Sequence, residues 1–234
     1  MSSSFPTLPC DRCIGRDLNI CGPLDSKRLK QLLTLGGPRR WQKGETLFRT
    51  DDSIGPFFKI RSGIVAVSQA LDDGRRQIVA LRVPGDCIGY LEEDGKYVFE
   101  GHALTSVEAC TFDRRRFDEF ASRNADLGAA TANALAAALR QAGHAMLVLG
   151  QLTSTERVAH FLVEIDFLYR ARHATGHSLS LLMSRSEIAD YLGLTIETVS
   201  RSFSKLRKDG IIRLIESDEV VILDHRKLRA IGKS

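Results

Sequence analysis

The stretch MSRSEIADYLGLTIETVSRSFSKLRKDGII (residues 183–212) has the pattern of two short helices joined by a sharp turn. Ser184 and Glu187 have the spacing of a capping box, which favours the start of a helix at this point. A small residue, a turn glycine and a compact β-branched residue stand where two crossing helices need them: Ala189, Gly193 and Val199. Because these steric requirements are met together, the stretch predicts a helix-turn-helix.

The second of these helices is expected to begin after Thr195 and to have one apolar and one basic face. We expect its inner face to hold Ile196, Val199, Phe203 and Leu206 and its outer face to hold Glu197, Ser200, Arg201, Lys205 and Lys208. An arginine can form two hydrogen bonds with guanine, a glutamate can accept one from cytosine, and a serine can contact base or phosphate. A solvated helix face can also be basic, but here the charge coincides with the steric pattern. The helix is therefore predicted to enter the major groove of DNA, with contacts from Glu197, Ser200, Arg201 and Lys205.

The segments on either side complete a C-terminal domain over residues 152–234. Residues 211–223, IIRLIESDEVVIL, have the pattern of a β-hairpin, which we interpret as the wing of a winged helix-turn-helix. Before the helix-turn-helix, Thr153 and Glu156 again have capping-box spacing, and the apolar periodicity that follows predicts a helix from Thr153 to Arg172.

The N-terminal part of the chain has a different pattern. Residues 24–36 predict a short helix, and from Trp41 to Phe112 short apolar runs alternate with turn signals such as DDG, RSG and PGD. Many short strands at regular spacing indicate a β-barrel or jelly roll, which we place at residues 24–118. Together with the C-terminal domain, this makes the predicted fold class α+β.

A long helix is expected between the two domains, at residues 119–151, where the chain is rich in alanine and leucine and has no proline. One apolar stripe recurs along it at three- and four-residue steps: Leu127, Ala130, Ala134, Leu135, Ala138, Leu139, Ala142, Met146 and Leu149. Such a stripe can lie on the core of its own domain or pack against an identical copy of itself. The pattern alone leaves both interpretations open.

Composition limits the compartment and the partners. The chain has 234 residues with a net charge of +4, which permits a nucleic-acid partner without establishing one. Its N-terminus, MSSSFPTLPC, has no basic leader or long apolar run, and no stretch approaches the roughly 18 apolar residues that a membrane span needs. We therefore expect a cytoplasmic protein with no membrane partner.

Three of the five cysteines lie within CDRCIGRDLNIC, residues 10–21, in the segment 1–23 that precedes the β-rich domain. An odd number of cysteines in a reducing compartment makes a disulfide framework the weaker explanation and favours metal binding or redox chemistry. Clustered thiolates select iron-sulfur centres or zinc, and both normally take a fourth ligand. Cys87 and Cys110 are the candidates for it, and spacing does not choose between them.

A β-rich N-terminal domain, a long helix and a C-terminal winged helix-turn-helix, in this order, resemble the CRP/FNR superfamily of transcription regulators. The run TIETVSRSFSKL also carries the E-x-x-S-R signature of the FNR branch at Glu197, Ser200 and Arg201. The resemblance implies a cyclic-nucleotide-binding-like sensor domain and a homodimer that binds palindromic double-stranded DNA with TTGA-type half-sites. It also implies RNA polymerase as a partner and a regulator, often an activator, rather than an enzyme.

Cyclic-nucleotide-binding members of the superfamily hold the phosphate with an arginine in the β-domain. No arginine lies between Arg82 and Arg114 in this chain, so we expect no cyclic-nucleotide effector. In the best-known members, the loop LDDGRRQIV has acidic residues that touch RNA polymerase. Here Arg75 and Arg76 occupy these positions, and that particular contact is not carried over.

Oxygen-sensing FNR-type proteins have three N-terminal cysteines, some with the C-x2-C-x7-C spacing, and one cysteine late in the β-domain. By this resemblance a [4Fe-4S] cluster is assigned to four ligands, Cys10, Cys13, Cys21 and Cys110, and Cys87 is interpreted as packing. In the family the intact cluster favours the DNA-binding dimer, and oxygen releases it, so anaerobic regulation is implied. Family members also have an acidic residue that opposes pairing of the dimer helix, but none lies between Asp126 and Glu156 here, so the dimer can be less strictly gated.

Three alternatives use the same cysteines or the same scaffold differently. The first is a regulator controlled by zinc or by thiol oxidation without iron. The second is a dithiol redox enzyme, which is disfavoured because nothing before Cys10 can form the strand that precedes the CxxC motif in thioredoxin-like enzymes. The third is a haem-linked gas sensor, for which the sequence has no distinguishing residue pattern.

Overall fold

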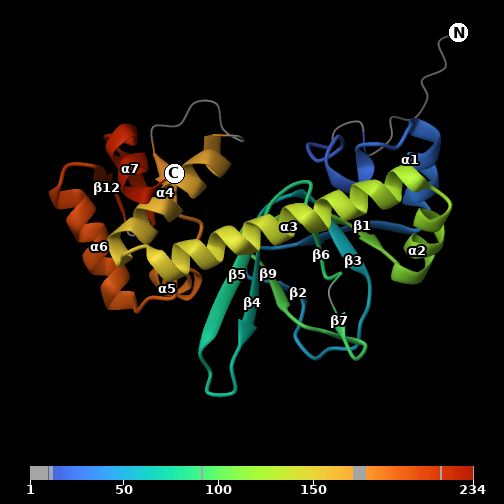
Figure 1. Cartoon of the computed structure of the whole chain (residues 1–234), viewed down its shortest axis with the longest axis horizontal. Coiled ribbons are helices and arrows are strands. Elements are labelled where there is room, and N and C mark those ends of the chain that lie inside the picture. Colours follow the sequence, from blue (N-terminus) through green and yellow to red (C-terminus); the bar gives the residue numbers. More distant parts are fainter. Residues whose placement is uncertain (1–9, 11–12, 91, 171–177, 217, 234) are drawn as a thin grey trace, which may run out of the picture. The chain divides into compact units, whose positions relative to one another are not determined.

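The computed structural model describes residues 10, 13–90, 92–170, 178–216 and 218–233, which form two compact units (Figure 1). The first unit comprises Met1–Arg75 and Val79–Gln141, and the second comprises Arg76–Ile78 and Ala142–Ser234. The expected α+β architecture is confirmed: a β-sandwich is followed by a long helix and a winged helix-turn-helix. The domain boundaries assigned from the sequence stay predictions.

Two four-stranded sheets form the sandwich of the first unit. One has the strand order β1-β10-β3-β6 and the other β2-β9-β4-β5. The strands of the first sheet are β1 (Gly36–Trp41), β3 (Phe57–Ser62), β6 (Cys87–Ile88) and β10 (Val107–Phe112). Those of the second are β2 (Thr46–Phe48), β4 (Val65–Ala70), β5 (Arg76–Arg82) and β9 (Glu100–Ala103), and β7 (Glu92–Glu93) pairs with β8 (Lys96–Tyr97) as a separate ribbon.

Side chains on β3 and β10 alternate between two different cores, because successive residues of a strand point to opposite faces. Phe58 and Ile60 join the core between the two sheets, together with Ala109 of β10. Phe57 and Phe112 point the other way and join a second core on the outer face of the first sheet. That face is covered by the cysteine segment and by three helices: α1 (Ser26–Leu33), α2 (Arg114–Ser122) and the start of α3 (Ala125–Gln151).

The single helix expected over residues 119–151 is wrong at its start. The chain forms α2 first, breaks at Arg123 and Asn124, and begins α3 at Ala125. The amide of Asn124 donates to the carbonyl of Phe120 at 2.7 Å, so this side chain competes for the backbone acceptors of the preceding turn.

No described helix is long and apolar enough to cross a membrane.

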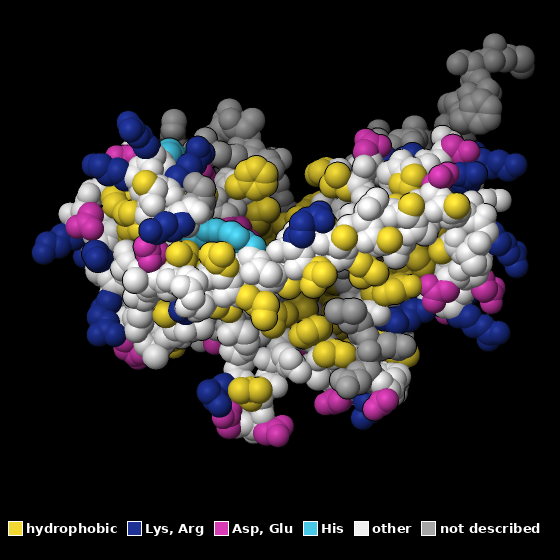
Figure 2. Space-filling view, viewed as in Figure 1, with side chains coloured by type: hydrophobic (Ala, Val, Ile, Leu, Met, Phe, Trp, Pro, Cys, Tyr) yellow, Lys and Arg dark blue, Asp and Glu magenta, His cyan; other side chains and the backbone are white. Residues whose placement is uncertain are grey.

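The apolar stripe of α3 divides into a buried and an exposed part. Leu127 at the start of α3 is fully buried in the outer core of the first unit. Further along, Leu139 is 74% exposed and Met146 is 75% exposed, and Leu135 and Leu147 are also exposed. Figure 2 shows hydrophobic side chains along this helix at the molecular surface.

The second unit is built around α4 (Ser154–Arg170), whose apolar face is buried against the helices that follow it. These are α5 (Arg185–Leu192), α6 (Ile196–Lys208) and α7 (His225–Gly232), and a three-stranded sheet has the order β11 (Leu179–Ser180), β13 (Glu219–Ile222), β12 (Ile212–Leu214). The hairpin β12–β13 confirms the predicted wing. The helix predicted up to Arg172 is present as α4 to Arg170, and residues 171–177 lie outside the described part of the chain.

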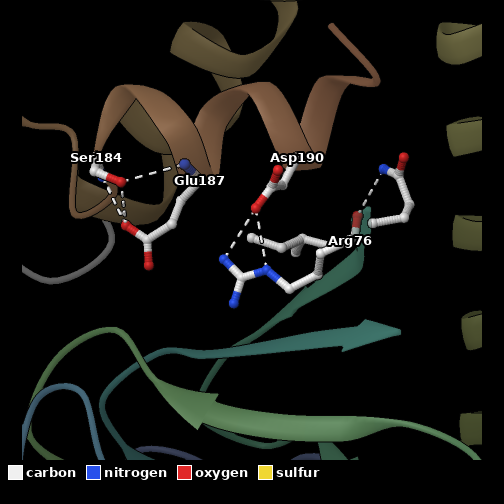
Figure 3. A network of polar contacts seen from close by, with 6 residues as sticks. Arg76, Ser184, Glu187 and Asp190 are labelled. Atoms are coloured by element: carbon white, nitrogen blue, oxygen red, sulfur yellow. Dashed lines mark hydrogen bonds and ion pairs between the residues drawn. The ribbon is translucent and has the colours of Figure 1, made fainter. Parts of the chain in front are cut away.

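The predicted capping box at the start of α5 is present (Figure 3). The Ser184 hydroxyl accepts from the backbone N–H of Glu187 at 3.2 Å, and the Glu187 carboxylate accepts from the backbone N–H of Ser184 at 2.7 Å. In the same view Arg76, which belongs to the second unit, donates to the carboxylate of Asp190 on α5 at 3.0 Å. These contacts fix the helix that precedes the turn of the helix-turn-helix.

Replacing Ser184 by alanine is expected to loosen α5. Loss of an N-cap side chain costs about 1 kcal/mol, so the backbone amides of α5 should exchange with solvent about five times faster in Ser184→Ala. Hydrogen exchange followed by mass spectrometry measures this directly. Ser204→Ala is the control because Ser204 is exposed on α6 away from its N-terminus. Equal exchange of α5 in both variants would contradict the capping role.

Candidate DNA interface and cysteine site

The turn between α5 and α6 has the geometry that the sequence predicts. Gly193 ends α5 in the left-handed conformation, with φ 59° and ψ 45°, where a side chain would be strained. Thr195 caps α6 by accepting from the backbone N–H of Thr198 at 3.2 Å. Ala189 and Val199 are both buried, so they fill the crossing point of the two helices as expected.

The outer face of α6 presents all the residues predicted to contact DNA. Glu197, Ser200, Arg201 and Lys205 are exposed, as are Arg207 and Lys208. One prediction for the inner face is wrong: Ile196 is 46% exposed, because the first turn of α6 extends past the packed surface. Ser202 takes an inner position instead and is buried. Ser202 is one helical step of three residues beyond the buried Val199, and this spacing is the feature of the sequence that indicates its inner position.

Glu197 and Arg201 offer a hydrogen-bond acceptor and a hydrogen-bond donor on the exposed face of α6. The backbone N–H at the start of α6 lowers the pKa of Glu197 first, followed by the Thr195 side chain and the charge of Arg201. Glu197 is therefore an ionised acceptor at neutral pH. The Arg201 guanidinium donates to the Thr198 hydroxyl at 3.1 Å and keeps its other N–H groups available. This part of α6 thus offers an acceptor and a donor one helical turn apart.

The cysteine site lies on the outer face of the first sheet. Cys110 on β10 pairs with Lys59 on β3, and Lys59 pairs with Cys87 on β6. Residues directly opposite each other on antiparallel strands project to the same face, so these three side chains form one row across the sheet. Cys10 and Cys21 are buried in the core that covers this face, and Cys87 and Cys110 pack against it.

Burial is the main influence on the thiols. The pKa of Cys110 is raised to about 12, mainly by burial; the charge of Arg61 opposes this, and the thiols of Cys21, Cys10 and Cys13 add smaller upward effects. Burial is also the main cause that raises the pKa of Cys87 to about 12; the charge of Lys59 opposes it, and Cys21 adds a smaller upward effect. Cys87 and Cys110 thus both pack against the core that contains Cys10 and Cys21, and the choice of Cys110 as the fourth ligand stays a prediction.

Backbone and side-chain contacts hold the cysteine segment on the sheet. Successive turns fold it locally: the backbone N–H of Cys13 donates to the carbonyl of Cys10 at 3.0 Å, and that of Arg16 donates to the carbonyl of Cys13 at 2.9 Å. The Arg16 guanidinium then donates to the carbonyl of Cys21 at 2.6 Å. The Asn19 amide donates to the carbonyl of Gly85 at 2.6 Å.

Two glycines allow the segment to approach this closely. A Cβ atom at Gly15 would lie 2.7 Å from the backbone nitrogen of Gly85, which no real side chain tolerates. Gly85 has φ 103° and faces the Leu18 side chain, so a side chain there would be both strained and obstructed. The Gly15–Gly85 contact therefore sets the height of the cysteine segment above the sheet.

All five cysteines have free thiols. Within the described residues, no three His, Cys, Asp or Glu side chains stand in an arrangement that could hold a metal ion. The thiols are thus gathered in one core without being set at coordinating positions. Sequence reasoning found the cysteines but missed Arg16, Asn19 and Lys59, whose roles depend on contacts between distant segments.

A β-sandwich joined through a long helix to a winged helix-turn-helix with a basic outer face defines a DNA-binding transcription regulator. Two family models match this chain: a Crp-like helix-turn-helix domain at residues 156–231 and a cyclic nucleotide-binding domain at residues 38–124. The second match concerns the domain, and the absence of a cyclic-nucleotide effector stays a prediction.

The curated relatives agree with both matches. The nitrogen fixation regulation protein FixK of Bradyrhizobium diazoefficiens is 34% identical over 95% of this chain and 93% of its own length. The transcriptional activator protein anr of Pseudomonas aeruginosa is 33% identical over 98% of this chain and 94% of its own. The structure of FixK2 from Bradyrhizobium japonicum superposes with a TM-score of 0.74 and 31% identity, covering 85% of this chain and 98% of that one. The chain belongs to the CRP/FNR family of transcription regulators.

Replacing Arg201 by alanine is expected to weaken sequence discrimination. Loss of one good base contact costs about 1 to 3 kcal/mol at a palindrome of TTGA-type half-sites, and much less at a site whose guanines are replaced. Fluorescence anisotropy on both duplexes at one fixed salt concentration measures the difference. Arg207→Ala is the matched control: this exposed cation lies outside the E-x-x-S-R signature and should weaken binding to both duplexes about equally. Unchanged discrimination in Arg201→Ala would contradict the assigned base contact.

Proposed function

We propose that this regulator responds to oxygen through a [4Fe-4S] cluster held by Cys10, Cys13, Cys21 and Cys110. It binds palindromic TTGA-type sites as a homodimer in the cytoplasm. We also propose that it activates anaerobically expressed genes by contacting RNA polymerase; activation is supported by its similarity to the transcriptional activator protein FnrL of Cereibacter sphaeroides. The observation that carries the proposal is the packing of Cys10, Cys21 and Cys110 in one core on the outer face of the first sheet, with Cys13 in a turn directly after Cys10.

The donor set suits an iron-sulfur cluster. Cys10 and Cys21 are buried in a largely apolar core, and Cys110 packs against it; soft sulfur ligands in such a setting select iron-sulfur centres or zinc. When bound, the cluster would supply an oxygen-reactive centre in place of four protonated thiols. Because the thiols share one core but do not stand at coordinating positions, binding of the cluster would tighten the cysteine segment against the sheet.

The same core connects the cysteine site to α3. Leu127 in the first turn of α3 packs in the core that contains Cys10 and Cys21. Arg28 of α1 also donates to the carboxylate of Asp126 at 3.1 Å, so a second contact ties α3 to the helix that follows the cysteines. A change in how the cysteine segment packs would therefore alter the start of α3.

Dimerisation through α3 gives its exposed apolar residues a partner. Leu135, Leu139, Met146 and Leu147 expose large hydrophobic side chains on one helix, which is unfavourable in water unless another surface covers them. A second copy of α3 would cover them with an equivalent surface. The dimer would also supply two α6 helices for the two halves of a palindrome.

Anaerobic purification tests the proposed function. A brown protein with broad absorption, which bleaches in air and simultaneously loses affinity for the palindromic duplex, supports it. A colourless protein with one zinc per chain would overturn it in favour of the zinc-controlled regulator. A metal-free protein whose DNA binding follows reversible thiol oxidation would overturn it in favour of thiol-redox control.

The fourth ligand is tested by two matched variants. Cys110→Ala is expected to abolish cluster retention and the response of DNA binding to oxygen, because it removes the proposed fourth ligand, which packs against the core with Cys10 and Cys21. Cys87→Ala removes a thiol from the same row of the sheet and should leave both properties largely intact. Iron content and anisotropy measured before and after exposure to air give the result. If the two variants behaved in the reverse way, Cys87 would be the ligand.

A further inference from the structure

Lys59 is an unusual residue for the middle of a buried strand. It lies on β3 with 2% of its surface exposed, and lysine is almost never fully buried without a partner. Its neighbours on the strand, Phe58 and Ile60, are ordinary core residues. A methionine or leucine would occupy the same space without the cost of desolvating an ammonium group. The charge at this position therefore needs partners on the outer face of the sheet.

Those partners belong to the cysteine site. The Lys59 ammonium donates to the carbonyl of Gly15, in the loop between Cys13 and Cys21. Burial raises the pKa of the Cys21 thiol, and the charge of the Lys59 ammonium, followed by its hydrogen bonding to the thiol, opposes that effect. Lys59 stands between Cys110 and Cys87 in the row across the sheet. A single side chain thus contacts the loop and the sheet that together contain all the cysteines.

Other charged groups near the site have partners of their own. The Arg16 guanidinium is occupied by the carbonyls of Cys21 and Leu24. Arg61 lies 3.5 Å from the Glu108 carboxylate. Burial raises the pKa of the Asp86 carboxyl. The Val83 N–H and the charge of Arg82 oppose this more strongly than the charge of Lys59 does. Lys59 is a buried cation that contacts the cysteine segment from the sheet.

We propose that Lys59 is a positioning residue that stabilises the proposed cluster, by donating a hydrogen bond to the Cys21 sulfur and by placing a buried positive charge beside the anionic ligand set. The inference rests on the proposed function. Four thiolates around an iron-sulfur core carry net negative charge, which is costly to bury without compensation. Hydrogen bonds to cluster sulfurs and a nearby positive charge also favour the reduced state, so they raise the reduction potential.

The test compares charge-removing and charge-keeping variants of the full chain, purified without oxygen. Lys59→Met and Lys59→Gln should lose iron to a chelator roughly tenfold faster than the wild type, and their reduction potential should shift to more negative values. Lys59→Arg should retain most of both properties. Lys30→Met is the control, because it removes an exposed lysine from α1 in the same unit.

Two further results separate the possible explanations. Thermal unfolding of the metal-free proteins should show Lys59→Met to be at least as stable as the wild type, since a purely structural role would make it less stable. A wild type with a cluster, together with charge-removing variants of unchanged iron loss and unchanged potential, would overturn this inference alone. A wild type without iron would overturn the proposed function, and this inference with it.

Discussion

The alternation of side chains along β3 and β10 is the constraint on which the first unit depends. Because neighbouring residues point to opposite faces, Phe58 and Ile60 fill the sandwich while Lys59 lies on the outer face beside Cys110. A shift of the register by one residue would place the lysine in the apolar sandwich and Cys110 away from the N-terminal cysteines. The sandwich core and the cysteine site are therefore specified by the same strand pairing.

The core on that outer face connects the cysteine segment to the rest of the chain. It contains Cys10 and Cys21, the helices α1 and α2, and the first turn of α3, so a change at the sulfur atoms acts on the packing of a helix. α3 continues from the first unit into the second, and most of its exposed apolar side chains follow the buried Leu127. The proposed cluster can shift the equilibrium between monomer and dimer only by the difference in its affinity for the two states.

The sequence predicted best those features that depend on local rules. The capping box at Ser184, the turn at Gly193 and the wing hairpin all follow from residues within a few positions of one another, and the structure confirms each. The break between α2 and α3 was missed because helix propensity is high on both sides and the Asn124 side-chain contact is invisible in the periodicity. Ile196 was misplaced because the first turn of a helix often lies beyond its packed face.

The cysteine site shows where such reasoning ends. Spacing identified three thiols and left two candidates for the fourth, and a family resemblance chose Cys110. The importance of Lys59 could not be predicted, because its partners Gly15 and Cys110 are distant in sequence and are brought together by strand register and by the close contact of Gly15 with Gly85. Non-local pairing of this kind leaves no periodic signal.

The central claim is that the gathered cysteines hold an iron-sulfur cluster. Native mass spectrometry of the full chain, purified and sprayed without oxygen, tests it most directly because it weighs the bound atoms. The account predicts a mass increase equal to four iron and four sulfide per chain, absent in Cys110→Ala. A bare chain, or a chain carrying one zinc ion, would contradict it.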